Sequence, residues 1–298
     1  MAAGGPDGVL LVDKPAGITS TRALAMAKRA VGSLKAGHTG TLDPFATGLL
    51  PLVFGEATKF SRFLLDADKS YVATLRLGAT SSTGDTEGEI EQRHPVTCSL
   101  PEIEAVSREM IGVSMQIPPM HSAVRVQGRR LYDLARQGLE VAREPRSIRI
   151  DFIEIVSFSG EQLVMSVKCS KGTYVRTLAE TIGEKLGCGA YLTGLRRTGT
   201  GGFHVEEAAT PEALAEMGPE AARARLLPVE VLVRSLPRAD LAEPEAWAVR
   251  NGQTLAARVP WSGDELALFG PAGEFIGVGR IAEGRLAAAR LMATGHSG

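Results

Sequence analysis

Cysteine and long apolar runs are scarce in this chain of 298 residues. The three cysteines, Cys98, Cys169 and Cys188, are widely spaced and form no CxxC pair, which argues against a disulfide framework or a structural zinc site. No stretch approaches the ~18 consecutive apolar residues that a membrane span needs. No basic flank precedes a long apolar run at the N-terminus. These absences predict a soluble cytoplasmic protein.

Sequence motifs for common cofactors are missing as well. The glycine-rich stretch GHTGTLDPFATG (residues 37–48) has no lysine after its last glycine, as a Walker-type phosphate loop requires, and its spacing does not fit GxGxxG. The five histidines form no HExxH motif, and no GxSxG nucleophile motif occurs. We therefore expect any reaction to use neither a metal nor a nucleotide cofactor.

The net charge of −1 hides an uneven distribution. Residues 121–149 contain seven arginines against three acidic residues, and residues 168–197 contain six lysines or arginines against two. Residues 204–220 contain five glutamates and no basic residue. A charge run by itself indicates a solvated face, but this distribution predicts basic surface in the first two thirds of the chain and an acidic segment after it.

Strand-like patterns dominate over helical ones. Residues 70–78 alternate, with Tyr71, Ala73 and Leu75 on one side, which predicts a half-buried strand. Other predicted strands lie at 9–12, 146–158, 161–170 and 190–198, and predicted helices at 21–31 and about 175–186. Since there is no regular βαβ repeat, we expect an α+β fold built on a largely antiparallel mixed sheet.

The composition changes near residue 230, where prolines cluster at positions 228, 237 and 244. The residues that follow read as short strands separated by glycine-containing turns. We therefore predict a large domain over residues 1–230 and a small β-rich domain over residues 231–298.

The acidic residue of the glycine-rich stretch is Asp43, which precedes Pro44. Aspartate before proline is typical of a turn. Three glycines and three threonines surround it, and they would also suit the close approach of a ligand to the backbone. Spacing alone leaves both interpretations open.

Several segments together resemble the TruB-type tRNA pseudouridine synthases. GHTGTLDPFATGLLPLVFGEATKF is similar to the family's aspartate signature, LLVDKPAGITS to its N-terminal KPxGxxS element, and DADKSYVATLRLG to its tyrosine-bearing strand. CSKGTYVRTLAETIGEKLGCGAYLTGLRR resembles its arginine segment, and IPPMHSAVRVQGRRLYDLARQGLEVAREPR its RNA-contacting insertion, about residues 119–147. The C-terminal segment resembles a PUA-like RNA-binding domain. These segments follow the family's order.

The resemblance implies the isomerisation of uridine 55 in the T-loop of tRNA to pseudouridine, without a cofactor. The base flips out, its N1–C1′ bond breaks, and C5 joins C1′. Asp43 would be the nucleophile, attacking C1′ or C6 or acting through a glycal-type elimination. Arg176 would keep this carboxylate charged by pairing with it. Tyr71 would stack on the uracil and is also a candidate for proton transfer.

The resemblance also assigns residues to substrate binding. His38, Tyr174 and Leu195 match positions that contact the nucleotide, and Lys14 matches the family's N-terminal lysine, for which we expect a supporting role. Two arginines of the insertion, Arg129 and Arg130, would bind phosphates. By residue type alone, these positions would be assigned to turns, packing or a solvated face.

Two other functions compete with this interpretation. One is an RNA-binding or tRNA-folding protein on the same scaffold whose main role is not catalytic. The other is a phosphate-handling enzyme, which would need a loop lysine and a metal-binding acid. The expected partner is tRNA, bound through its T-arm and T-loop. We expect no membrane association, no protein partner and a monomer.

Overall fold

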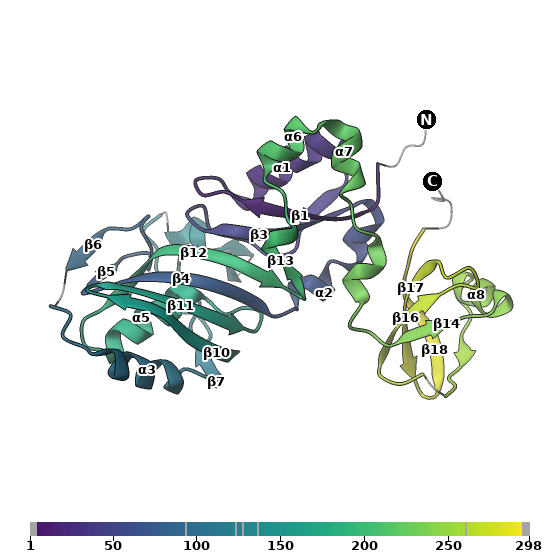
Figure 1. Cartoon of the computed structure of the whole chain (residues 1–298). Helices are drawn as coiled ribbons and strands as arrows, with labels where there is room; N and C mark the ends of the chain where they lie inside the picture. Colours follow the sequence, from purple (N-terminus) through teal and green to yellow (C-terminus); the bar gives the residue numbers. More distant parts are fainter. Residues whose placement is uncertain are drawn as a thin grey trace.

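The computed structural model describes residues 5–92, 94–122, 124–126, 128–135, 137–259 and 261–293. Within these ranges the chain forms a large mixed sheet and, after it, a smaller five-stranded sheet, which Figure 1 shows side by side. None of the helices in these ranges combines the length and the apolar character needed to cross a membrane.

The large sheet has the strand order β1-β3-β12-β4-β11-β10-β7, with β2 paired to β3 and β13 paired to β12. Its described strand pairs are antiparallel, apart from β3 with β12. The strands are β1 (Gly8–Lys14), β2 (Ala36–His38), β3 (Thr47–Phe54), β4 (Lys69–Leu77), β7 (Gly112–Gln116), β10 (Arg146–Ser159), β11 (Gln162–Cys169), β12 (Ala190–Thr200) and β13 (Phe203–His204). The predicted α+β class on a largely antiparallel mixed sheet is confirmed.

Helices cover the two ends of this sheet. In Figure 1, α1, α6 and α7 gather beside β1 and β3, whereas α3 and α5 pack at the other end. Helix α1 begins after Thr19, whose side-chain oxygen accepts a hydrogen bond from the Arg22 backbone N–H. The helices are α1 (Ser20–Val31), α2 (Arg62–Leu65), α3 (Leu100–Glu109), α5 (Val175–Lys185), α6 (Pro211–Glu216) and α7 (Gly218–Ala224). Short 3₁₀ helices span Gly55–Phe60, Val205–Glu207 and Val229–Val233.

The alternation of β4 places one row of its side chains against α5. Ala73 and Leu75 are fully buried in the same cluster as Leu178 and Ile182. Tyr71 lies on this side of the strand and packs at the margin of the cluster. The apolar pattern of β4 and α5 therefore brings the start of the strand and the first turn of the helix together.

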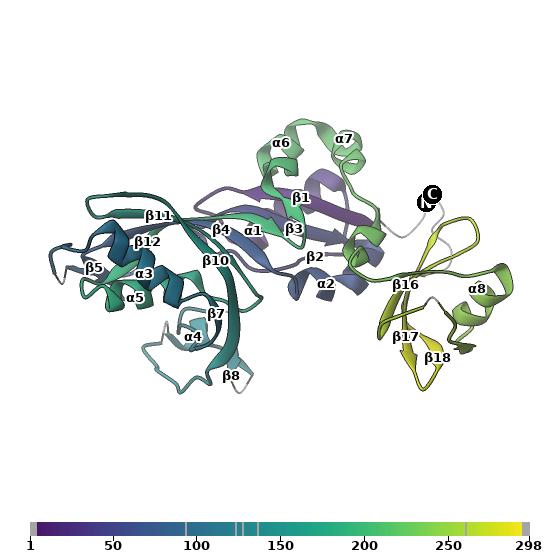
Figure 2. The ribbon, with the colours of Figure 1, turned by 60° about the horizontal axis from the view of Figure 1, so that its bottom comes forward.

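The chain between β7 and β10 includes the predicted insertion. It forms a small hairpin, β8 (Arg125–Val126) and β9 (Arg129–Arg130), followed by α4 (Leu131–Ala135). Figure 2 shows this segment projecting from the sheet beside β10. A second hairpin, β5 (Ala79–Ser81) with β6 (Ile90–Gln92), follows the C-terminal end of β4.

The smaller sheet has the order β14-β16-β17-β18-β15 and carries α8 (Glu243–Arg250). Its strands are β14 (Arg238–Asp240), β15 (Leu255–Ala256), β16 (Glu265–Phe269), β17 (Phe275–Ala282) and β18 (Arg285–Leu291). Phe275 packs edge-on against Phe60, with 5.3 Å between ring centroids, and Lys59 donates a 3.1 Å hydrogen bond to the Leu291 carbonyl. The predicted β-rich C-terminal domain is confirmed, while a boundary at residue 230 stays a prediction.

Candidate active site

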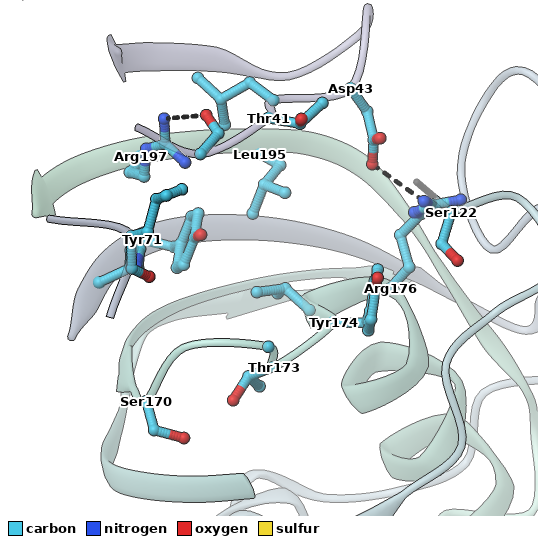
Figure 3. A pocket seen from close by; sticks show the side chains of 16 residues that line it. Thr41, Asp43, Tyr71, Ser122, Ser170, Thr173, Tyr174, Arg176, Leu195 and Arg197 are labelled. Carbon is cyan, nitrogen blue, oxygen red and sulfur yellow. Dashed lines mark hydrogen bonds and ion pairs between the residues drawn. The ribbon is translucent and has the colours of Figure 1, made fainter. Parts of the chain in front are cut away.

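A cavity of about 270 Å³ opens where the loop before β3, the start of β4, the first turn of α5 and β12 meet. Asp43, Tyr71, Tyr174, Arg176 and Leu195, which are far apart in the sequence, all line it. In Figure 3, Asp43 points toward Arg176 on one side of the cavity, and Tyr71 and Leu195 rise from the neighbouring strands. The fold thus gathers five of the residues that the sequence assigned to one site.

The loop that carries Asp43 is held by the N-terminal KPAGITS element. Ser20 donates through its hydroxyl to the Leu42 carbonyl at 3.0 Å and accepts from the Leu42 N–H at 2.8 Å. The Gly17 N–H donates to the Pro44 carbonyl at 2.9 Å. The buried Lys14 ammonium donates to the carbonyls of Pro15 and Ile18 and, at 3.3 Å, to that of Pro44. Both neighbours of Asp43 are therefore fixed, which limits the positions open to its carboxylate.

Arg176 lies between two carboxylates and is only 4% exposed. Its Nη2 is 3.1 Å from Asp43 Oδ2, and its Nη1 is 3.4 Å from Asp85 Oδ2. The same guanidinium donates to the carbonyls of Thr83, at 3.0 Å, and His121, at 2.6 Å. A planar guanidinium can serve several acceptors at once, which a lysine ammonium could not do in this geometry.

Asp85 is the more deeply buried partner, with 1% of its side chain exposed. Its Oδ1 accepts hydrogen bonds from the Thr83 hydroxyl at 2.6 Å and from the Glu87 N–H at 3.0 Å. Asp43 is 34% exposed and faces the cavity. Asp85 therefore holds Arg176 without lining the cavity, while the Asp43 carboxylate is open to a molecule bound in the cavity.

Burial raises the pKa of the Asp43 carboxyl above its ordinary value of 3.8, and Arg176 opposes this shift. The charge of Asp85 adds to the increase, while that of Lys14 opposes it. A carboxylate that is poorly solvated by water and held by a single cation on one oxygen is more reactive toward an electrophile than a hydrated one.

The Tyr71 hydroxyl lies next to the buried guanidinium of Arg197. Arg197, 2% exposed, donates from Nε to the Leu49 carbonyl at 2.6 Å and from Nη2 to the Gly40 carbonyl at 3.1 Å. Desolvation raises the pKa of Tyr71, whereas the charge of Arg197 and a hydrogen bond with its guanidinium oppose the rise. Arg197 thus joins β12 to the cavity loop and directs a positive charge toward the Tyr71 hydroxyl.

Gly48 makes the close contact between β3 and β12 feasible. Its φ is +102°, and a Cβ there would lie 2.2 Å from the Arg197 carbonyl oxygen. The sequence left open whether the glycines of this loop allow a ligand to approach the backbone. At Gly48 the space that a side chain would take is filled by the backbone of the neighbouring strand.

Three of the proposed substrate-binding residues do not line the cavity in the described ranges. His38 lies on β2, with its Nδ1 buried and without a hydrogen-bond partner, and its pKa is lowered by burial and by Arg197. Lys14 donates a hydrogen bond to the Pro44 carbonyl, in the loop that carries Asp43. Arg129 lies on the projecting hairpin and donates to the Gln137 side chain at 2.7 Å, while the side chain of Arg130 is outside the described part of the chain.

Four other residues at the site were missed by sequence reasoning. Arg197, Lys69 and Ser122 line the cavity, and Asp85 stands behind Arg176. The only local signal was for Asp85, which lies in a threonine- and glycine-rich turn, TGDTEG, similar in composition to the Asp43 loop. Nothing near Arg197 in the sequence distinguishes it from Arg196, which is half-exposed and paired with Asp13.

Solved structures with this fold define the class of protein. The chain resembles the crystal structure of a Cbf5-Nop10-Gar1 complex, with a TM-score of 0.71 and 29% identity over 92% of this chain and 78% of that one. It also resembles a structure of an H/ACA RNP bound to a substrate RNA containing 2′-deoxyuridine, with a TM-score of 0.72 and 26% identity over 96% of this chain and 85% of that one. The fold is that of a pseudouridine synthase.

Sequence comparison gives the family. Residues 28–175 match the TruB family pseudouridylate synthase N-terminal domain, residues 176–234 the tRNA pseudouridylate synthase B C-terminal domain, and residues 237–292 the pseudouridine synthase II TruB C-terminal domain. The tRNA pseudouridine synthase B of Azoarcus sp. (strain BH72) is 50% identical over 97% of this chain and 95% of its own. That of Thiobacillus denitrificans is 49% identical over 97% of this chain and 96% of its own. The chain therefore belongs to the TruB family and is a tRNA-modifying pseudouridine synthase.

Proposed function

We propose that this enzyme converts uridine 55 in the T-loop of tRNA to pseudouridine, with Asp43 as the nucleophile. The observation that carries this proposal is the Asp43–Arg176 ion pair on the wall of a cavity that also contains Tyr71. A carboxylate can act as a nucleophile, a neighbouring cation keeps it charged, and an aromatic ring can stack on a planar base.

The carboxylate begins the reaction in its ionised form. It attacks C1′ of the ribose or C6 of the uracil, or removes a proton on the way to a glycal. Each of these routes requires a charged Asp43, and Arg176 favours that charge in a desolvated position. Because Arg176 is itself held by Asp85 and two carbonyls, it does not follow Asp43 when the carboxylate moves toward the substrate.

Isomerisation needs no external reactant. The N1–C1′ bond breaks, the detached uracil rotates until C5 faces C1′, and C5 bonds to C1′. The proton on C5 is then removed by a base, and N1 takes up a proton, so that atoms and electrons balance. Tyr71, which lines the cavity, would stack on the ring during this rotation, and Arg197 opposes the rise in the pKa of its hydroxyl that burial causes.

The base reaches this cavity only if its nucleotide leaves the T-loop stack. Flipping costs a few kcal/mol, roughly the energy of unstacking one base. Contacts between phosphates and the basic insertion at residues 119–147 offset this cost. Leu195 and Tyr174, which line the cavity, supply the apolar surface that the flipped nucleotide would occupy.

Substitution of Asp43 by asparagine tests the proposal, because it keeps the shape of the side chain and removes the nucleophile. We expect pseudouridine formation in a tRNA transcript to fall by on the order of 10⁴-fold, while the affinity for that tRNA stays within a few-fold. Tritium release from C5-labelled uridine gives the rate, and filter binding gives the affinity.

Two comparisons define the outcome. Asp240→Asn makes the same chemical change at an exposed residue of the second domain and should leave the rate unchanged. A transcript with cytidine at position 55 should release no tritium. Wild-type rates in Asp43→Asn would refute the role of Asp43, and full release from the position 55 variant would refute the assigned target.

A further inference from the structure

We infer that Gln116 is a positioning residue, which sets the direction of Arg176 by holding the first turn of α5. This inference rests on the proposed role of the Asp43–Arg176 pair. Gln116 is the last residue of β7 and lies immediately before the insertion. It does not line the cavity, and its effect on the reaction is exerted through the backbone of Tyr174.

The side-chain amide of Gln116 bonds to both polar groups of the Tyr174 backbone. The Tyr174 N–H donates to Gln116 Oε1 at 2.8 Å, and Gln116 Nε2 donates to the Tyr174 carbonyl at 3.1 Å. The pair resembles a rung of a β-ladder in which one partner is a side chain. Two bonds in one plane fix both the position and the rotation of the Tyr174 peptide groups.

Helix α5 needs such an external support because its own sequence lacks one. Its N-cap residue is Tyr174, which makes no side-chain capping bond. In a capping box the third helical residue would be Glu or Gln and would accept the N-cap N–H, but here it is Thr177, whose buried Oγ1 has no hydrogen-bond partner. Gln116 supplies the missing acceptor from another element. Gln116 thus fixes the start of α5, and Arg176 is the second residue of this helix.

The same part of the chain also touches Arg176 directly. Gln116 is held by its pairing with Arg146 of β10, and five residues later the His121 carbonyl accepts a 2.6 Å hydrogen bond from Arg176 Nη2. The next residue, Ser122, lines the cavity with its hydroxyl buried. The start of the insertion therefore contacts the first turn of α5 through Gln116 and the Arg176 guanidinium through His121. Its position is thus coupled to the geometry of the Asp43–Arg176 pair.

Loss of the Gln116 contact should appear in the chemical step and not in tRNA affinity. A misplacement of about 1 Å at a reacting group can cost roughly 100-fold in rate. We expect Gln116→Ala to lower the single-turnover rate by about tenfold to 100-fold. The dissociation constant for tRNA should change less than about threefold, because no phosphate contact is removed.

The pH dependence of the rate of Gln116→Glu distinguishes a positioning role of Gln116 from a purely structural one. An ionised glutamate keeps the acceptor for the Tyr174 N–H but lacks the donor for its carbonyl, whereas a protonated glutamate supplies both. The rate deficit of this variant should be about tenfold at pH 8 and should narrow to about sixfold at pH 5.5, as the protonated fraction of the carboxyl grows.

The matched control is Gln162→Glu, the same change at an exposed residue at the start of β11. All rates are divided by those of this control at each pH. Thermal unfolding of both variants, read by circular dichroism, separates loss of the fold from loss of positioning. Asp43→Asn, run in parallel, tests the proposed nucleophile independently of Gln116.

The inference is supported if the Gln116→Glu deficit is large at pH 8 and shrinks on acidification. A deficit that does not depend on pH, a rate for Gln116→Ala within twofold of wild type, or a loss confined to tRNA affinity would each overturn it. If Gln116→Ala does not fold, the pH profile of Gln116→Glu decides. An active Asp43→Asn would instead overturn the proposed function.

Discussion

Arg197 carries a full positive charge in a position that is almost closed to water. Its described polar contacts are the carbonyls of Leu49 and Gly40 and the Tyr71 hydroxyl, none of which is a carboxylate. Burying a charge without an opposite charge is costly, and hydrogen bonds to the charged form offset only part of that cost. This desolvation cost falls beside Tyr71, the residue proposed to stack on the uracil.

Arg197→Lys tests how much the fold depends on this guanidinium. Lysine keeps the charge but cannot reach both carbonyls and the tyrosine hydroxyl, so we expect a loss of about 2–4 kcal/mol in the free energy of unfolding. The control is Arg196→Lys on the same strand, where the partly exposed pair with Asp13 should cost less than about 1 kcal/mol. Urea unfolding gives both values. Equal losses in the two variants would contradict this account.

The residues of the site differ in how far the sequence could reveal them. Asp43, Arg176 and Tyr71 stood in segments whose composition or family resemblance singled them out, and the structure brings all three to one cavity. For Asp85 the only signal was the composition of its turn, and nothing near Arg197 distinguished it from Arg196, because the roles of both residues come from burial and from partners far away in the chain. Local patterns cannot report on burial of a charge.

At the level of elements, the turn after β1 acts as a support for the cavity loop. Lys14 is fully buried, and its ammonium holds three carbonyls, including that of Pro44. Desolvation lowers the pKa of Lys14 from 10.5 to about 8, although Asp43 opposes the shift. The protonated form is therefore tolerated only because these acceptors surround it.

The lowered pKa of Lys14 predicts how stability changes with pH. Between pH 8 and 10.5 the unfolded chain retains the proton that the folded chain has released, so this residue should add stability as pH rises, by at most about 1.4 kcal/mol per pH unit. The variant Lys14→Met lacks this gain. Urea unfolding at pH 8 and pH 10 should show that the difference in unfolding free energy between wild type and variant moves in favour of wild type at the higher pH. A constant difference, or a shift toward the variant, would show that the Lys14 pKa is not lowered.

Across the whole molecule, the uneven charge of the sequence becomes an uneven surface. The basic insertion projects beside β10, whereas most of the acidic segment 204–220 lies on α6 and α7 and the turn before them (Figures 1 and 2). A polyanion such as tRNA is attracted to the first region and repelled by the second. The charge distribution therefore favours an orientation of tRNA in which the insertion contacts it.

Arg129→Ala tests this orientation. Arg129 lies on the insertion, and its described partner, Gln137, is an amide that leaves its charge unneutralised. We expect tRNA binding to weaken by about threefold to tenfold at 0.1 M salt, and the slope of log affinity against log salt to fall by about one. The control is Arg22→Ala on α1, an exposed arginine at the other end of the sheet, which should leave both quantities unchanged. Identical salt slopes for wild type and Arg129→Ala would contradict a phosphate contact. Sedimentation of the same samples tests the predicted monomer.

The sequence by itself determined the α+β class, the main strands and helices, and the loop that carries Asp43, because alternation, helical periodicity and turn residues act over short distances. The tertiary structure decided which charges are buried and what holds them. It placed Arg197 beneath Tyr71, Asp85 behind Arg176 and Gln116 against the start of α5. These contacts join residues far apart in the chain, and their energies depend on the exclusion of water, which no local pattern of residues records.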